Sequence, residues 1–563
     1  MSRYTLGLDF GTESARVVIV DVETGKVVGR HRTVYAHGVL SDRLPTGEAL
    51  GDKWALQHPK DWVDAVEESV PQAVAQAGIR ASDIVGIGID FTSCTLLPID
   101  VDGMPLCLRD DYRRRPHSWP KLWKHHAAWK EASRLTEVAR SRNEVFLSRC
   151  GGHISPEWAL PKMLQVLEED EQIWAAADRF VEAGDWMVFH LTGAFVRNAG
   201  GAGFKAMWHV RDGFPPSDYL RAVHPQLAHL AATKLRGPVV PVGARAGRLA
   251  PSVAKRLGLP AGIPVATAVI DAFAAVPGLG VTAAGQLALA MGTSTCHMLL
   301  ASHEVLVEGI TGVVRDGIVP GYFGYEAGQA AVGDIFAWYA KSVPVDVVRA
   351  ADGAGVSIFT WLEREAARLA PGESGLIALD WWNGNRSVLA DTQLSGAVLG
   401  YSLATTPAEV YRALMEATAF GTRRIVEQFE AANLPVQTLH IGGGIAQKNA
   451  FLMQLYADIT GRKVYVPSES ENVAVGAAIF GAMVAGREHG GYDTFAEAVE
   501  SMTSGHPGAV YSPNPAHRAT YDKLYQVYLT LHDDLGRDRA YLMHELRHLR
   551  EAAKAPIGDC AGE

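Results

Sequence analysis

Leu8-Asp9-Phe10-Gly11-Thr12-Glu13-Ser14 is the stretch on which the fold prediction rests, and Leu289-Ala290-Met291-Gly292-Thr293-Ser294-Thr295 repeats its pattern almost half a chain length later. In each copy an apolar segment runs into a Gly-Thr pair. Self-similarity of this kind indicates an internal duplication. We therefore predict an α/β protein built from two similar halves.

A second, looser echo supports the duplication. The apolar run 85–89 enters Asp90, and the run 439–441 enters Gly442-Gly443-Gly444. If the two halves face one another, the two Gly-Thr turns would lie at one cleft.

The surrounding sequence has the alternation of an α/β protein. Residues 4–36 predict three antiparallel strands joined by tight turns, 62–77 predict a helix, and 84–89 predict a buried strand. Apolar residues at 264–270 predict another strand, and small residues at 473–486 predict a helix that packs closely at a domain interface. The Pro- and Gly-containing segment 238–264 is the best place for a domain boundary.

Composition describes a globular protein and disfavours some functions. The chain has 563 residues, of which 48% are hydrophobic and 20% charged, and its net charge is −10 with a pI of about 6.1. An acidic surface disfavours a sequence-independent nucleic-acid binder, which needs basic groups to neutralise phosphates.

The cysteines and the N-terminus favour a cytoplasmic location. Five scattered cysteines form no C-x-x-C pair, so neither a disulfide framework nor a cysteine zinc site is expected. Asp9 and Glu13 interrupt any signal-peptide core. The uncharged stretch 272–291 carries Pro277 and many small residues, so we interpret it as a buried helix followed by a strand, with no membrane contact.

The Gly-Thr turns favour phosphate binding. Without a Cβ, glycine lets a phosphate approach backbone N–H groups closely. Asp9, beside Gly11-Thr12, would hold Mg²⁺ directly or through water, and the alternative is a turn-forming aspartate. The glycines 442–444 could present bare backbone to a flat ring or a phosphate, or form a flexible turn.

Asp271 lies where the predicted strand 264–270 passes into a helix. The helix dipole favours its ionised form there, so Asp271 could act as a general base. Helix N-capping is an equally good interpretation, because aspartate is a common N-cap.

Four other motifs give weaker evidence of function. Asp9-Phe10-Gly11 spells a protein-kinase triplet without the motifs that must precede it, and Gly25-Lys26 lacks the glycine of a Walker A loop. The H-E-x-x-H match at 544–548 fits a zinc helix formally, but a solvated terminal helix is the better interpretation. The cluster Arg113-Arg114-Arg115 predicts a solvated loop, although it could attract anionic nucleotide if it lies near a cleft.

Taken together, these motifs resemble the FGGY carbohydrate kinases over nearly the whole chain. The matching stretches are 7–12, 86–90, 122–124, 205–209, Asp271, 292–296, 326–329, 333–338, 379–384 and 443–449. The stretches 326–338 and 379–384 resemble the ribulokinase branch of that family. Phe91 departs from the smaller polar residues that follow the matching aspartate there.

The resemblance implies a two-domain actin/hexokinase-like (ribonuclease H-like) ATPase fold with an interdomain catalytic cleft. Residues 1–284 would form the sugar-binding domain, and residues 285–563 the nucleotide-binding domain. The implied activity is ATP- and Mg²⁺-dependent phosphorylation of the terminal hydroxyl of L-ribulose, a ketopentose, to L-ribulose 5-phosphate.

The resemblance also implies roles for individual residues. Asp271 would be the catalytic base, and Asp9 the metal-binding residue. The implied sugar contacts are Ser93, Trp123, Lys205, Asp271 and Glu326. The implied ATP contacts are Gly11, Thr12, Gly292, Thr293, Ser294, Gly443, Gly444 and Asn449.

Three alternatives remain at this point. The chain could phosphorylate another pentulose or polyol, such as D-ribulose, ribitol or xylulose. It could be a sugar-independent actin-like ATPase, because one fold hosts several functions. The match at 544–548 leaves a zinc hydrolase as the third. The protein could also form a homodimer.

Overall fold

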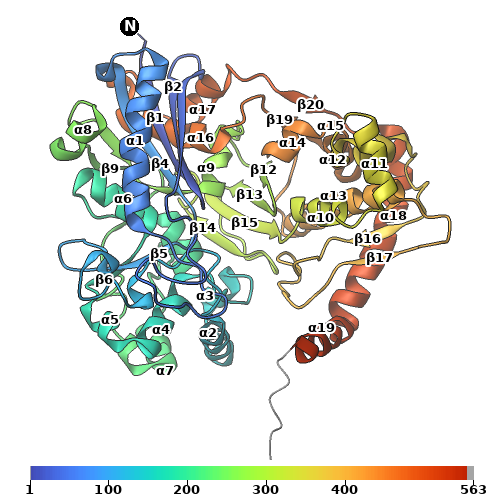
Figure 1. Cartoon of the computed structure of the whole chain (residues 1–563), viewed down its shortest axis with the longest axis horizontal. Helices are drawn as coiled ribbons and strands as arrows, with labels where there is room; N and C mark the ends of the chain where they lie inside the picture. Colours follow the sequence, from blue (N-terminus) through green and yellow to red (C-terminus); the bar gives the residue numbers. More distant parts are fainter. Residues whose placement is uncertain (1, 555–563) are drawn as a thin grey trace, which may run out of the picture. The chain divides into compact units, whose positions relative to one another are not determined.

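The computed structural model describes residues 2–554, which divide into two compact units (Figure 1). Unit 1 contains residues 1–288, 298–326 and 467–509, and unit 2 contains 289–297, 327–466 and 510–563, each within the described range. The segment 238–264 lies wholly inside unit 1, where β9 and β10 pair, so the prediction of a domain boundary there is wrong.

Residues 2–554 contain two seven-stranded sheets. The first has the order β3-β2-β1-β4-β10-β9, with β11 also paired to β4, and the second has the order β14-β15-β13-β12-β18-β19-β20. The strands of the first are β1 (Tyr4–Phe10), β2 (Ser14–Asp21), β3 (Val27–Val34), β4 (Ile84–Phe91), β9 (Arg245–Arg248), β10 (Pro264–Ala266) and β11 (Val269–Ile270). Those of the second are β12 (Gln286–Met291), β13 (Thr295–Ala301), β14 (Gly312–Arg315), β15 (Phe323–Gln329), β18 (Thr438–Gly442), β19 (Lys463–Val466) and β20 (Ala509–Tyr511).

The two sheet orders confirm the duplication predicted from the sequence. β1 and β12 each precede a Gly-Thr turn, and each lies between its hairpin partner and a later strand, β4 or β18. Those later strands are the ones that form the second sequence echo. The Gly11 and Gly292 N–H groups donate to the carbonyls of Ser14 and Ser294, so the two turns also close in similar ways.

The early strands and helix occur as predicted, with small differences at their ends. Residues 4–36 form β1, β2 and β3, which pair antiparallel. Helix α1 (Pro59–Ala77) begins before Trp62, because His58 caps it and Pro59 supplies a suitable first residue. The predicted strand 264–270 is divided into β10 and β11, since Thr267 bonds to Ala244 and Pro241 instead.

The hydrophobic core of unit 1 lies between the first sheet and helices α1, α6 (Ala183–Thr192) and α8 (Pro251–Leu257). A second core holds the short helices α2 (Trp129–Ser141), α3 (Val145–Arg149), α4 (Ala159–Glu169), α5 (Glu171–Ala176) and α7 (Ser217–Val223), together with a short sheet of β5 (Leu96–Ile99) and β6 (Arg179–Glu182). In unit 2 the larger helices are α10 (Gly333–Ala340), α11 (Val345–Gly353), α12 (Ile358–Arg368), α13 (Pro407–Ala431), α15 (Ala450–Thr460), α18 (Pro515–Asp533) and α19 (Ala540–Lys554).

Two small-residue helices pack together inside unit 1. A Cβ added to Gly476 of α16 (Asn472–Ala485) would lie 1.7 Å from the Ala274 carbonyl oxygen of α9 (Asp271–Gly278). The close packing predicted for these helices is therefore confirmed. Both helices belong to unit 1, and their place at a domain interface stays a prediction.

The segment 272–291 forms all of α9 after its first residue and then β12, as predicted. Among residues 2–554, no helix combines the length and the apolar character needed to cross a lipid bilayer.

Candidate active site

Asp9 and Asp90 lie side by side near the ends of two parallel strands. β1 and β4 pair in a register that sets Asp9 opposite Asp90, and β2 sets Arg16 opposite Asp9. Arg16 Nη1 donates to Asp9 Oδ2 at 2.9 Å. Both aspartates are buried, at 3% and 0% exposed. One arginine therefore faces two buried carboxyl groups.

Of the two carboxyl groups, that of Asp90 has fewer partners to stabilise its negative charge. Within residues 2–554, neither of its carboxylate oxygens accepts a hydrogen bond from a donor group. Burial raises its pKa well above the usual value, and the nearby charges of Asp9 and Asp271 raise it further. Burial also raises the pKa of Asp9, against the opposing effect of Arg16. Unsatisfied carboxylate oxygens are ligands that suit a hard divalent cation, so this pair fits Mg²⁺.

Asp271 follows directly on β11, whose pairing with β4 brings it beside the two aspartates. Burial raises its pKa to about 7; the Ala272 N–H, 2.7 Å from Oδ1, opposes the shift, and the Asp9 charge adds to it. Ile270 holds the N-cap position of α9, and Asp271 is its first helical residue. Only Oδ1 of Asp271 serves the helix start, by accepting the Ala272 N–H. A carboxyl group with a pKa near 7 is suited to general-base work.

Lys205 and Glu326 form a buried ion pair, with Lys205 Nζ 2.7 Å from Glu326 Oε2. Lys205 ends a π-helical turn over 201–205, a geometry that often occurs at functional sites. Both charges act on Asp271, whose pKa Lys205 lowers and Glu326 raises. Glu326 belongs to unit 1, although it lies beyond residue 284 in the sequence.

Trp123 and Thr12 are in direct contact. The indole Nε1 donates to Thr12 Oγ1 at 3.1 Å, and the side chain of Gln57 donates to the Thr12 carbonyl at 2.7 Å. The turn after β1 is therefore held by an aromatic residue that the resemblance places on the sugar. Gly11, the preceding residue, is only partly exposed.

Ser93 lies in the turn between β4 and β5 and is partly exposed. Phe91 points elsewhere: it is buried, stacks on Phe10 with ring centroids 4.8 Å apart, and meets Trp62 edge-on at 5.0 Å. Its departure from the family pattern is therefore accommodated in the core of unit 1.

In unit 2, the second Gly-Thr turn is fixed by backbone hydrogen bonds. The Gly292 carbonyl accepts from the Gly333 N–H at 3.1 Å, and the Thr293 carbonyl accepts from Val332 at 2.8 Å. Gly292 and Thr293 are exposed, and Ser294 is partly exposed. A rigid, accessible turn of this kind presents backbone N–H groups to a phosphate at little entropic cost.

The triple glycine of unit 2 lies close to the same turn. Gly443 has a φ of 113°, and a Cβ there would lie 2.0 Å from the Met291 carbonyl oxygen, so only glycine fits. Gly444 is exposed and has open space around it. Asn449 is buried and caps α15 through Oδ1, which accepts from the Leu452 N–H at 2.7 Å. The side-chain oxygen of Asn449 therefore has a structural role as a helix cap.

Three functional candidates were missed by sequence reasoning: Asp90, Arg16 and Gln57. For Asp90 and Arg16, the signal that could have identified them is strand pairing, because only the register of β1 with its two neighbours sets them opposite Asp9. The apolar run before Asp90 predicts the strand but not its neighbour. Gln57 precedes α1 and has no motif of its own.

The motifs given less weight behave as solvated structure. His544 Nε2 lies 2.7 Å from Asp391 Oδ2, and no third His, Cys, Asp or Glu among residues 2–554 joins the 544–548 motif as a metal-binding group. The arginines Arg113, Arg114 and Arg115 each pair with a carboxylate, those of Asp110, Glu48 and Asp170.

The duplicated fold and this set of carboxylates agree with the resemblance to carbohydrate kinases, and comparisons with known proteins show the class, an ATP-dependent sugar kinase of the actin/hexokinase-like fold. A model of the N-terminal domain of the FGGY family of carbohydrate kinases matches residues 4–278, and one of its C-terminal domain matches 287–485. The chain belongs to the FGGY family of carbohydrate kinases.

Relatives match nearly the whole chain. It is 51% identical to a ribulokinase of Geobacillus thermodenitrificans, over 98% of each chain, and 50% identical to a ribulokinase of Halalkalibacterium halodurans, over 99% of each. The fold is similar to that of a xylulose kinase from Rhodospirillum rubrum, with a TM-score of 0.78 at 23% identity, covering 97% of this chain and 100% of that one.

Proposed function

We propose that this protein transfers the γ-phosphoryl group of ATP to the terminal hydroxyl of L-ribulose, giving L-ribulose 5-phosphate and ADP. The observation that carries the proposal is the group formed by Asp271, Lys205 and Glu326 beside the Asp9–Asp90 pair. Full-length similarity to ribulokinases supports the choice of sugar.

In this mechanism Asp271 accepts the proton of the attacking hydroxyl, because its carboxylate is half-ionised near neutral pH. Lys205 and Glu326 would orient the sugar through its hydroxyls and carbonyl, and Trp123 would supply an apolar face. Ser93, which follows β4, would complete the sugar contacts. A sugar without charges needs such directional groups to be held in line for transfer.

The nucleotide and its metal would use a second set of groups. Asp9, with Asp90 beside it, would hold Mg²⁺, whose charge stabilises the transferring phosphoryl group. Backbone groups of the two Gly-Thr turns and of the triple glycine would hold the phosphates and the nucleoside, with the Asn449 amide Nδ2 beside them. The proposed ATP contacts are Gly11, Thr12, Gly292, Thr293, Ser294, Gly443, Gly444 and Asn449.

The assignment of sugar binding to residues 1–284 and nucleotide binding to 285–563 stays a prediction, and Glu326 would be the exception to it. A cytoplasmic location is part of the proposal and is supported by Cys94, Cys107 and Cys150, which are buried free thiols. Cys560 lies outside the described residues. The homodimer also stays a prediction.

The test is ADP release from MgATP by the purified full-length chain with L-ribulose, D-ribulose, D-xylulose, ribitol, glycerol or no sugar. We expect the highest kcat/KM with L-ribulose and negligible turnover without sugar. Asp271→Asn should keep nucleotide binding and lose about 10²- to 10⁴-fold in kcat. Preference for another sugar would reject L-ribulose as substrate, and sugar-independent hydrolysis would favour an actin-like ATPase.

A further inference from the structure

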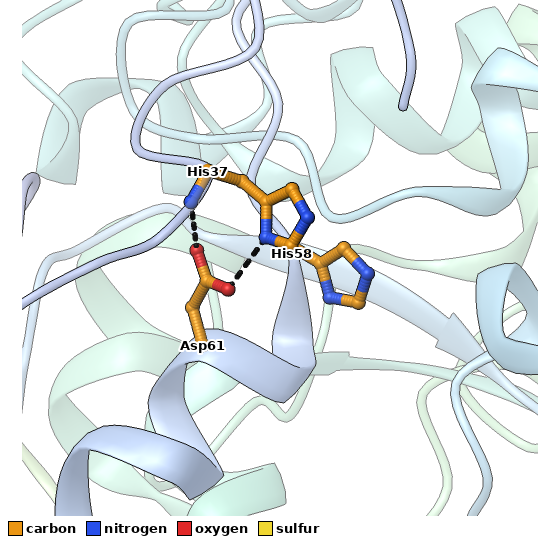
Figure 2. Close-up of side chains that lie close together, drawn as sticks. All are labelled: His37, His58 and Asp61. Atoms are coloured by element: carbon orange, nitrogen blue, oxygen red, sulfur yellow. Dashed lines mark hydrogen bonds and ion pairs between the residues drawn. The ribbon is translucent and has the colours of Figure 1, made fainter. Parts of the chain in front are cut away.

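Two histidines and an aspartate meet at one place in unit 1, and none of them belongs to the groups proposed above for the sugar, ATP or Mg²⁺ (Figure 2). His37 lies in the loop after β3, His58 caps α1, and Asp61 lies in the first turn of α1. Their candidate ligand atoms all lie within 4.8 Å of one another. In residues 2–554 this is the single group of three such side chains that are this close.

Asp61 holds His37 through two contacts. Its Oδ2 accepts the backbone N–H of His37 at 3.0 Å, and its Oδ1 lies 2.7 Å from His37 Nδ1 (Figure 2). The aspartate side chain is only 3% exposed, whereas that of His37 is 38% exposed. The carboxylate is thus fixed inside the protein, and the imidazole remains open to an ion from solvent.

His58 is placed to join them. Its ring stacks on His37 with centroids 4.4 Å apart and an angle of 19° between the planes, and it meets Trp119 edge-on at 5.1 Å. The Lys60 N–H donates to His58 Nδ1 at 3.2 Å, so that nitrogen carries the lone pair, and an ion bound there would replace this helix-capping hydrogen bond. Burial, helped by His37, lowers the pKa of His58 to about 4, which keeps the ring neutral at neutral pH.

We propose that His37 Nδ1, His58 Nδ1 and Asp61 Oδ1 bind one first-row transition-metal ion, with Zn²⁺ as the best-suited probe. Two imidazoles and one carboxylate with an open position for water form a donor set that zinc accepts. Tetrahedral zinc holds neighbouring ligand atoms about 3.3 Å apart. Because the two imidazole rings are stacked, at least one of them must also turn before both Nδ1 lone pairs point at one ion.

Binding requires the proton between His37 Nδ1 and Asp61 Oδ1 to leave that nitrogen. The neutral ring then carries its proton on Nε2, exchanged through solvent, so Nδ1 gains the lone pair for the metal and no net proton is released. The ion would then connect the loop after β3 to the start of α1. Because metal binding to the folded state alone stabilises that state, the observable consequence is a rise in thermal stability.

The experiment titrates tag-free, full-length protein with Zn²⁺ by calorimetry and follows the melting temperature. We expect one ion per chain, and at least a tenfold loss of affinity in both His37→Ala and His58→Ala. His126→Ala is the matched control, because His126 is an exposed histidine paired with the carboxylate of Glu157 but with no second histidine in its group. It should bind zinc as the wild type does.

His544→Ala separates this site from the 544–548 motif. Zinc binding that survives in His37→Ala and His58→Ala but is lost in His544→Ala would overturn the proposal in favour of α19. An absence of stoichiometric binding to the wild type would overturn it outright. His37 is exposed, so its replacement should leave the fold intact and keep the test informative even if His58→Ala folds poorly.

Discussion

The environment of Asp271 sets the chemistry that one residue can perform. A carboxyl group in water has a pKa near 4, so it is a weak base at neutral pH. Burial raises the pKa of Asp271 to about 7, and the charges of Asp9 and Glu326 add to the shift while Lys205 opposes it. The same residue at an exposed helix start would serve only as a cap.

This arrangement predicts how activity depends on pH. Below the pKa of Asp271 the base is protonated, so kcat/KM for the sugar should fall about tenfold per pH unit below pH 7. Lys205→Met should move this fall in kcat/KM, the acid limb of the pH profile, to higher pH, because it removes a positive charge that lowers the pKa of Asp271. Glu326→Gln should move it to lower pH, because it removes a negative charge. The measurement is kcat/KM against pH at saturating MgATP.

The two variants provide opposite controls for each other. Each also weakens sugar binding, so KM alone does not separate the roles, whereas the direction of the pH shift does. Limbs that stay at the wild-type pH in both variants would show that neither charge acts on the base.

At the scale of elements, glycines let α16 approach the first sheet and α9 closely. A Cβ on Gly7 of β1 would lie 1.9 Å from the Ala474 carbonyl oxygen, and one on Gly88 of β4 would lie 1.7 Å from that of Ala477. Both obstructing atoms are backbone, so side-chain rotation cannot relieve the clash. Here the requirement for glycine comes from packing and not from a positive φ.

Gly88→Ala should therefore destabilise the protein by about 3 kcal/mol, since a rigid backbone must move to admit one methyl group. Urea denaturation followed by tryptophan fluorescence would measure it. Gly353→Ala, at the exposed end of α11 with open space around it, is the control and should be neutral or slightly stabilising. Equal stability of Gly88→Ala and wild type would contradict the packing argument.

At the scale of the whole molecule, the sequence was most informative where local pattern and duplication agree. The hairpin of β1 and β2, the strand β4 and the two Gly-Thr turns follow from alternation, turn residues and repetition. The place of α16 could not be predicted in the same way. Its small apolar residues show that it packs closely, but they do not identify a partner that lies hundreds of residues earlier.

The residues of the candidate site show the same contrast between those that local motifs identify and those that only long-range pairing brings together. Asp9, Asp271 and the glycines could be located because motifs surround them. Asp90 and Arg16 required the register of three strands, and the membership of Glu326 in unit 1 required the tertiary contacts of β15. Side chains that meet only through long-range pairing leave no periodic signal in the sequence.

The composition of unit 1 leads to a last prediction, about which fragments of the chain can fold. The N-terminal family model ends at residue 278, which suggests that a fragment 2–286 would be an independent domain. Unit 1, however, also contains 298–326 and 467–509, and the second of these segments carries α16. Without α16, the fragment would expose the surface formed by Gly7, Gly86 and Gly88 together with their apolar neighbours. We expect it to keep far-UV circular dichroism, lose near-UV signal and bind a hydrophobic dye, as a compact state without fixed packing does.

Adding the fragment 287–563 should restore the near-UV signal, because that fragment returns α16. The same fragment carrying Gly481→Leu in α16 should not restore it, because the Gly481 Cβ position lies 2.9 Å from the Gly88 backbone nitrogen. Cooperative unfolding of 2–286 alone, with a native near-UV spectrum, would show that the first sheet does not need α16.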